Sequence, residues 1–156
     1  QVRKGPYPKF HILHGNMTAE EISRLYRNKS IKCLINLTRG EGFGLPILEA
    51  ATSGLPIIAT GWSGHMDFMN MGRFIPVNYR LVDVHNDKVD GRIFVNGLRW
   101  AEPNENDFKK KVKKFRERSQ IPTQWAEDLS KILLETHSQS AINKLYNRVL
   151  KEETGL

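Results

Sequence analysis

The sequence is poor in the residues that build disulfides and membrane spans. Cys33 is the only cysteine among the 156 residues, so no internal disulfide can form, and we expect an inert thiol within an apolar strand. No apolar run approaches the roughly 18 residues that cross a bilayer, and the first residues do not resemble a secretory signal. These absences favour a reducing compartment, and we expect a cytoplasmic protein, with the membrane face as an alternative location.

Metal-binding patterns are also missing. The 5 histidines have no spacing typical of a metal site, and no Asp-x-Asp pair is present to hold a nucleotide-bound cation. We therefore expect neither a metal nor another cofactor. Internal repeats and low-complexity segments are absent too, and with 39% hydrophobic residues the chain can bury one core.

The first half of the chain alternates short apolar runs with an amphipathic segment. The predicted strands are 11–14, 32–38 and 56–60. The strand at 32–38 is apolar enough to be buried on both faces. Thr18 and Glu21 have the spacing of a capping box, which predicts a helix over 19–27. This alternation predicts an α/β fold with a Rossmann-like parallel sheet and flanking helices, whose ligands bind at the carboxyl ends of the strands.

The second half is predicted to be mainly helical after an irregular strand at 74–83. Apolar residues recur at helical spacing in three stretches. These are Phe108, Val112 and Phe115; then Trp125, Leu129, Ile132 and Leu133; and finally Ile142, Leu145, Tyr146 and Val149. We expect a single α/β domain over 1–156, with the α/β core at 1–118 and packing helices at 119–156.

A glycine-rich loop follows the strand predicted at 32–38. Three glycines within 40–44 let the main chain approach a ligand closely. Pro46 then stands at the start of a short helix that ends near Gly54. The amides and the dipole at the start of that helix would suit a phosphate group.

Two carboxylates flank this helix start. Glu41 lies in the loop, where it could meet a group beyond the phosphates. Glu49 lies one turn into the helix, where it could accept hydrogen bonds from sugar hydroxyls, as acidic residues do in other nucleotide sites. An ordinary helix-favouring residue is the alternative interpretation of Glu49.

The run EGFGLPILEA at 41–50, followed by SGLPIIAT at 53–60, closely resembles the E-x7-E region of GT-B glycosyltransferases of the family-4, or group 1, type. Weaker similarity continues through GWSGHMD at 61–67 and WAEP at 100–103, so roughly residues 10–118 are covered. The resemblance implies the C-terminal, nucleotide-sugar-binding lobe of a GT-B fold.

The resemblance also implies roles for particular residues. Glu41 would be catalytic, beside the transferred sugar and its hydroxyls, and Glu49 would hold the nucleotide ribose. The main-chain amides between them would contact sugar and phosphate, at Gly42, Phe43, Gly44 and Leu45. Such enzymes typically transfer a hexose from a UDP or GDP sugar to a hydroxyl, with retention and without a bound metal, by electrostatic stabilisation of the leaving diphosphate.

The chain departs from the family pattern at its beginning. Family members have a preceding acceptor-binding domain and, on an earlier loop of the donor-binding domain, an Arg/Lys pair that grips the diphosphate. We expect both to be missing, because the chain begins too late for either and two domains need roughly twice this length. Arg3-Lys4-Gly5 has the right residue types but stands too close to 11–14, so we expect a basic terminus instead. We therefore expect the isolated chain to be inactive, and a non-catalytic interaction module of the same fold is the alternative.

The loop after the strand predicted at 56–60 is a candidate wall of the same cleft. Its residues are Trp62, Ser63, Gly64 and His65. Packing and hydrogen bonding are the more ordinary roles of a Trp and a His beside a glycine turn, so we assign them no catalytic role.

The net charge of +7 is concentrated in one segment. Residues 109–118 contain seven basic residues and one acidic residue. A solvated helix face is the ordinary interpretation. Contact with an anionic membrane surface is an alternative, through Lys109, Lys110, Lys111, Lys113 and Lys114. Nucleic-acid binding is less favoured, because no aromatic platform accompanies the charge.

Overall fold

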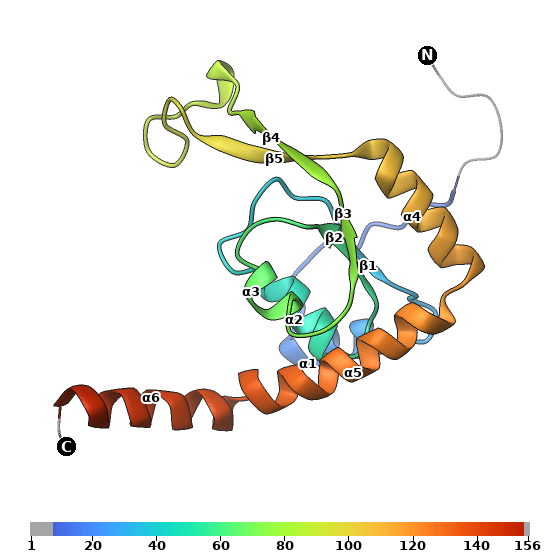
Figure 1. Ribbon diagram of the computed structural model, residues 1–156. Coiled ribbons are helices and arrows are strands. Elements are labelled where there is room, and N and C mark those ends of the chain that lie inside the picture. Colours follow the sequence, from blue (N-terminus) through green and yellow to red (C-terminus); the bar gives the residue numbers. More distant parts are fainter. Residues whose placement is uncertain (1–7, 155–156) are drawn as a thin grey trace, which may run out of the picture.

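The computed structural model describes residues 8–154 and is an α/β fold in which helices flank a small parallel sheet (Figure 1). The helices, with one 3-10 turn named η1, are α1 (Ala19–Tyr26), α2 (Leu45–Thr52), α3 (Met66–Met69), η1 (Asn86–Lys88), α4 (Glu105–Glu117), α5 (Gln120–His137) and α6 (Gln139–Thr154). The strands are β1 (Leu34–Asn36), β2 (Ile57–Thr60), β3 (Ile75–Val77), β4 (Tyr79–Asp83) and β5 (Arg99–Pro103). The predicted α/β class with a Rossmann-like parallel sheet is confirmed.

β2 is the central strand of the parallel sheet, whose order is β1-β2-β3. All its residues are buried, as expected for a strand covered on both faces. β1 is an edge strand whose Ile35 is 45% exposed, so the predicted burial of 32–38 on both faces is wrong. The apolar character of that run reflects Leu34 and Cys33, which pack against the core. Burial raises the pKa of the Cys33 thiol, which favours the unreactive protonated form.

The strand predicted at 11–14 is wrong, because residues 8–18 form no regular secondary structure. The large apolar side chains of this stretch are exposed at Phe10, Ile12 and Leu13. A strand is stabilised by the strand that it pairs with, and the edge strand β1, at only 3 residues, offers a short partner to the run at 11–14. The predicted capping box is confirmed: Glu21 N donates to Thr18 Oγ1 at 3.2 Å, and Thr18 N donates to Glu21 Oε2 at 2.7 Å.

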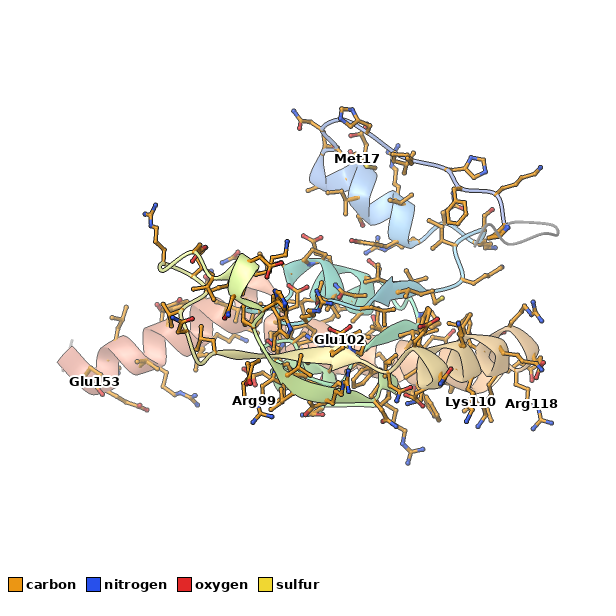
Figure 2. The ribbon with its side chains drawn as sticks, turned by 90° about the horizontal axis from the view of Figure 1, so that it is seen from above. Met17, Arg99, Glu102, Lys110, Arg118 and Glu153 are labelled. Atoms are coloured by element: carbon orange, nitrogen blue, oxygen red, sulfur yellow. The ribbon has the colours of Figure 1, made fainter. Side chains whose placement is uncertain are left out.

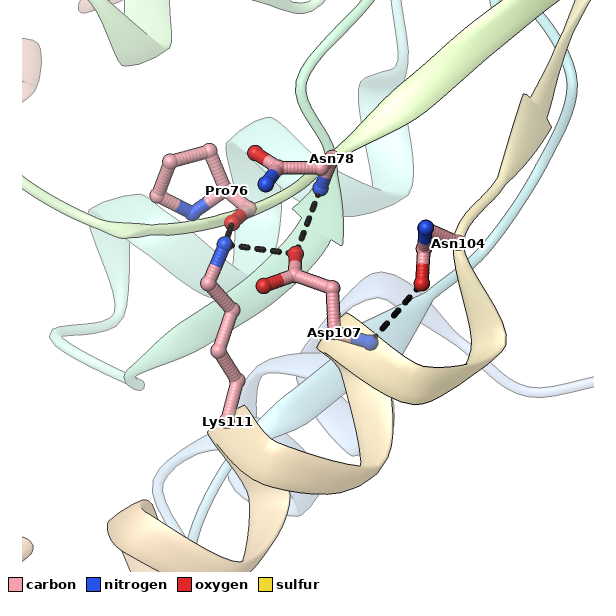
Figure 3. Close-up of polar contacts among 5 residues, drawn as sticks. All are labelled: Pro76, Asn78, Asn104, Asp107 and Lys111. Atoms are coloured by element: carbon pink, nitrogen blue, oxygen red, sulfur yellow. Dashed lines mark hydrogen bonds and ion pairs between the residues drawn. The ribbon is translucent and has the colours of Figure 1, made fainter.

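The single strand predicted at 74–83 is divided at Asn78 into β3 and β4. Asn78 N donates to Asp107 Oδ2 at 2.7 Å, so the first turn of α4 holds the chain at the division (Figure 3). β4 then pairs antiparallel with β5 in a separate sheet that extends beyond the parallel one (Figure 1).

Two apolar clusters hold the helices against the parallel sheet. The larger one joins α2 and α5 and contains Ile47, Ala50, Ala51, Leu55, Ile57, Ala59, Phe68, Met69, Leu129 and Leu133. The smaller one joins α4 to β2 and β3 through Ile58, Val77 and Phe115, with Phe108 and Val112 packed against it. The predicted core-facing stripe of α4 is therefore confirmed.

The two C-terminal helices differ in how much of their predicted apolar stripes they bury. In α5, Leu129 and Leu133 are buried, whereas Ile132 is 37% exposed. α6 continues from α5 and leads away from the sheet (Figure 1). Its stripe is exposed at Leu145, Tyr146 and Val149.

Candidate functional site

Two loops meet at the carboxyl ends of β1 and β2. The 39–44 loop lies between β1 and α2, and the 61–65 loop lies between β2 and α3. Because β1 and β2 are parallel, both loops leave the same edge of the sheet. The predicted catalytic, donor-binding and cleft-wall residues lie in these loops or at the first residue of α2, with the exception of Glu49.

Hydrogen bonds tie the two loops together at Glu41. The Ser63 hydroxyl accepts from Glu41 N at 2.8 Å and donates to Glu41 O at 2.6 Å, and Gly64 N also donates to Glu41 O at 3.1 Å. Ser63 has a φ of 90°, which few residues other than glycine adopt. A side-chain carbon added to Gly64 would overlap Gly42 O. Ser63 and Gly64 therefore fix the main chain on which Glu41 stands.

The carboxylate of Glu41 is oriented by Asn36, the last residue of β1. Asn36 Nδ2 donates to Glu41 Oε1 at 3.2 Å. The amide of Asn36 is itself held, because its Oδ1 accepts from Thr38 N at 2.9 Å and from Thr38 Oγ1 at 2.7 Å. Sequence reasoning did not identify Asn36, although a polar side chain at the carboxyl end of an apolar strand is a signal for a site at this edge.

Gly44 begins α2 in a conformation that glycine favours. It is the N-cap residue, with a φ of 86°, and a side-chain carbon there would lie 2.9 Å from His65 Cβ. The first N–H groups of a helix find no partner within it, and the positive end of the dipole lies at the same place. The start of α2 therefore suits an anion. The predicted helix start around Pro46 and its end at Gly54 are both confirmed.

The side chains of Phe43 and Leu45 have different surroundings. The Phe43 ring packs against Phe68, at 5.3 Å between centroids, and near His137 at 6.4 Å, so it anchors the 39–44 loop to α3 and α5. Leu45 is largely exposed at the start of α2. The donor-binding roles predicted for these two residues thus concern their main-chain N–H groups.

Glu49 lies on the face of α2 that looks toward α1. It is exposed and lines a cavity of about 230 Å³ together with Ala19, Ile22, Ser23, Tyr26, Arg27, Thr52 and Ser53. Burial raises the pKa of the Tyr26 hydroxyl, and the negative charge of Glu49 raises it further. Glu41 and Glu49 therefore contact different groups, and the structure does not bring the two carboxylates together.

Arg39 joins the 39–44 loop to the β4–β5 hairpin, a connection that the sequence did not reveal. Arg39 Nε lies 2.7 Å from Glu102 Oε2, and its guanidinium lies 4.6 Å from the centroid of the Trp100 ring. Ala101 N donates to Arg39 O at 3.0 Å. The hydrogen bond between the two side chains raises the pKa of Arg39 and lowers the pKa of Glu102. These contacts hold the main chain two residues before Glu41.

The predicted cleft-wall residues do not share one role. The Trp62 ring packs against Tyr79 at 5.4 Å between centroids, which joins the 61–65 loop to the start of β4. His65 is 1% exposed, and its Nε2 lies 2.8 Å from Thr60 O. A carbonyl oxygen only accepts, so Nε2 carries a proton and donates it there. His65 is thus buried and hydrogen-bonded to the main chain at the end of β2.

The basic residues of α4 also differ in their surroundings. Lys110 on α4 and Arg118 at its C-terminal end lie at the surface (Figure 2). In contrast, Lys111 Nζ donates to Asp107 Oδ2 at 2.7 Å and to Pro76 O (Figure 3). Lys109 pairs with Glu105 one turn away. Lys111 is thus part of the fold rather than of a free basic face.

Across residues 8–154, no group of three or more His, Cys, Asp or Glu side chains could hold a metal ion. Within the same range, none of the helices combines the length and the apolar character that crossing a membrane requires. Arg3-Lys4-Gly5 lies outside the described residues.

Known proteins resemble this chain over most of its length. Residues 6–131 match the family described as glycosyl transferases group 1. A sucrose synthase from Melioribacter roseus is 29% identical over 110 residues, which are 70% of this chain and 11% of that protein. Sucrose-phosphate synthase 4 from Arabidopsis thaliana is 33% identical over 109 residues, which are 66% of this chain and 9% of that protein. The chain thus spans about a tenth of the length of these two relatives.

Proposed function

Since the chain belongs to the group 1 glycosyl transferases, we propose that it is the donor-binding part of an enzyme that transfers a sugar from a nucleotide sugar to a hydroxyl acceptor. The proposed donor is of the UDP or GDP type, the transferred group is a hexose, and the configuration at its anomeric carbon is retained. No metal takes part in the proposed reaction.

The observation that carries this proposal is the fixed position of Glu41 beside the start of α2. Ser63 and Gly64 hold its main chain, and Asn36 holds one of its carboxylate oxygens. Arg39, which lies in the same loop two residues before Glu41, is held by its ion pair with Glu102. A carboxylate constrained in this way, next to a helix N-terminus, suits a ligand that carries both hydroxyl groups and phosphates.

The proposed ligand extends along the start of α2. Glu41 would accept hydrogen bonds from hydroxyls of the transferred sugar, and the amides of the 42–45 segment would meet the sugar and the diphosphate. Glu49 would accept from the ribose. Glu49 stands four residues after Leu45, or about 6 Å along the helix axis. Glu41 and Glu49 have separate surroundings, which is consistent with a diphosphate that lies between the two carboxylates.

In the proposed reaction, the bond from the anomeric carbon to the diphosphate oxygen breaks, and the diphosphate leaves with the electron pair. The acceptor hydroxyl oxygen then bonds to the same carbon, and its proton passes to the departing phosphate oxygen. Main-chain N–H groups at the start of α2 would stabilise the charge that grows on the diphosphate. Glu41 would fix the position of the sugar while this happens.

We propose that acceptor binding belongs to a preceding domain of the complete enzyme, and that the basic pair that grips the diphosphate lies on an earlier loop of the donor-binding domain itself. On this proposal, the 156-residue chain binds donor nucleotides weakly and does not turn them over. Calorimetry with UDP and GDP tests the first part. We expect saturable binding of one of them, and no heat from either at millimolar concentrations would contradict the proposed donor site.

Glu41→Gln tests in the same experiment whether Glu41 contacts the nucleoside diphosphate. We expect this variant to bind the free nucleoside diphosphate within about twofold of the unaltered chain, because Glu41 meets the sugar and not the diphosphate. A form of the protein extended at its N-terminus tests the non-catalytic alternative. If that form keeps Glu41 and still neither hydrolyses nor transfers a sugar, a non-catalytic interaction module is the better assignment.

A further inference from the structure

Another cavity lies between β3, α4 and α5. Its volume is about 460 Å³, within the roughly 300–1,000 Å³ typical of small-molecule sites. Most of its lining is apolar and consists of Phe74, Ile75, Pro76, Phe115, Ile121, Pro122 and Trp125. The basic residues Lys111, Lys114 and Arg118 complete it. None of these residues belongs to the candidate donor site.

Two of the three basic side chains are open to a ligand. Lys111 is occupied by Asp107 and by the carbonyl of Pro76 (Figure 3). Lys114 and Arg118 are exposed, and among residues 8–154 neither side chain has an ion pair or a hydrogen bond. Two uncompensated positive charges beside an apolar cavity are complementary to an anionic group on an apolar chain.

An added β-strand is a poor occupant of this cavity, although β3 is an edge strand. Pro76 has no N–H to offer, and its carbonyl already accepts from Lys111 Nζ. A proline on an edge strand resists pairing with another strand, and here its carbonyl is occupied as well. The cavity is therefore suited to a ligand that needs no ladder hydrogen bonds.

We propose that this cavity binds a long-chain anionic amphiphile, with its acyl chain against the apolar lining and its acid group between Lys114 and Arg118. Trp125 supplies a large apolar surface to the wall. Ile121 lines the cavity and is 60% exposed, so it offers further apolar surface to the acyl chain. A free long-chain acid and an anionic membrane lipid share this chemistry.

Calorimetry of the 156-residue chain with dodecanoate, below its micelle concentration, tests the site. We expect saturable binding of one dodecanoate. Butanoate, which lacks the long chain, and dodecanol, which lacks the charge, should each bind at least about tenfold more weakly. Equal binding of dodecanol and dodecanoate would overturn the role of the two cations, and an absence of saturable binding would overturn the site.

Two pairs of variants locate the binding. The double variant Lys114→Gln/Arg118→Gln should weaken dodecanoate binding about tenfold. The double variant Lys110→Gln/Lys113→Gln removes the same amount of charge from α4 outside the cavity, and it should change dodecanoate binding less than about twofold. Ile121→Glu should abolish binding, whereas Leu134→Glu, also exposed on α5, should not. Thermal unfolding shows whether each variant folds. Equal losses within either pair would overturn the proposal.

Vesicles of phosphatidylcholine, with and without phosphatidylglycerol, distinguish the two sources of the ligand. If the ligand is a membrane lipid, Ile121→Glu should release the chain from phosphatidylglycerol vesicles. If the ligand is a free acid, Ile121→Glu and the unaltered chain should bind vesicles alike, and only the dodecanoate titration should differ. Either vesicle result supports the proposed binding site only together with saturable binding in the dodecanoate titration.

Discussion

At the scale of single residues, Gly64 is the position where the site has the least space. Replacing Gly64 by Ala would place a carbon against the main chain of Gly42, so the 39–44 and 61–65 loops would have to separate. We expect Gly64→Ala to lower the free energy of unfolding by about 1–3 kcal/mol and to weaken UDP binding. Chemical denaturation and calorimetry measure the two effects.

Gly42→Ala is the matched control for this prediction. A side-chain carbon at Gly42 meets no atom within 4 Å, and its φ is not positive. We expect its free energy of unfolding to change by less than about 0.5 kcal/mol. Equal destabilisation by the two alanines would show that close packing of the loops is not the cause.

Glu49 allows the proposed ribose contact to be tested by itself. Glu49→Gln should weaken UDP binding about tenfold and leave inorganic pyrophosphate binding unchanged, because only UDP carries a ribose. Glu20→Gln, which removes a carboxylate from the exposed face of α1, should affect neither ligand. Parallel loss of UDP and pyrophosphate binding in Glu49→Gln would place this residue at the phosphates instead.

Glu49→Gln should also change the pKa of Tyr26, which can be measured without any ligand. The charge of Glu49 adds to burial in raising the pKa of Tyr26, so Glu49→Gln should lower that pKa while leaving it above the ordinary value of about 10. Absorbance of the ionised phenol during an alkaline titration measures the change. An identical titration curve in Glu49→Gln would mean that Glu49 does not face Tyr26 in solution.

At the scale of elements, Asp107 connects the start of α4 to the junction of β3 and β4. It accepts from Asn78 N and from Lys111 Nζ, each at 2.7 Å, and its own N–H donates to Asn104 Oδ1 at 2.9 Å (Figure 3). Burial alone would raise the pKa of Asp107, but the hydrogen bonds from Lys111 and Asn78 outweigh it and lower the pKa. The ionised form is therefore the one that stabilises the fold.

The stability contributed by Asp107 should depend on pH in one direction. A carboxylate whose pKa is lower in the folded state stabilises fully above its unfolded pKa, about 4, and this contribution is lost as pH falls through the folded pKa. Asp107→Asn should cost about 1–2 kcal/mol at pH 7 and less at pH 3. Urea unfolding at both pH values tests this, with exposed Asp128→Asn as a control. A cost that does not change with pH would contradict it.

The elements that were predicted correctly carry their signals locally. The capping box of Thr18, the Pro46 start and the Gly54 end of α2, and the stripe on α4 are all contained within a few neighbouring residues. The errors depend on distant partners. The run at 11–14 resembles a strand but does not pair, and β3 and β4 separate because of a hydrogen bond from Asn78 to a residue 29 positions away.

The candidate site shows the same division between local and distant signals. Its loop, its glycines and the start of α2 could be predicted from the segment 40–54. The residues that hold Glu41 could not, because Ser63 is 22 positions away and the partner of Arg39 is 63 positions away. Asn36 is the exception, since it lies only 5 positions before Glu41.

At the scale of the whole molecule, α5 and α6 should differ sharply in their importance for stability. Leu133 on α5 is 0% exposed within the larger cluster, whereas Leu145 on α6 is 45% exposed. Leu133→Ala should cost about 2–5 kcal/mol. Leu145→Ala, the same change of side chain, should cost well under 1 kcal/mol. Similar losses of unfolding free energy in the two variants, measured by denaturant unfolding, would mean that α6 packs against the rest of the protein in solution.

The link between Arg39 and Glu102 also has a consequence for the order in which the chain folds. The residues that pair between β1 and β2 are 23 positions apart and those between β2 and β3 are 17 apart, whereas this link joins residues 63 positions apart. Contacts between distant residues form late, because the entropy of closing the loop is lost before they contribute. We therefore expect the parallel sheet to form first and the 39–44 loop to join the β4–β5 hairpin only in the last steps of folding.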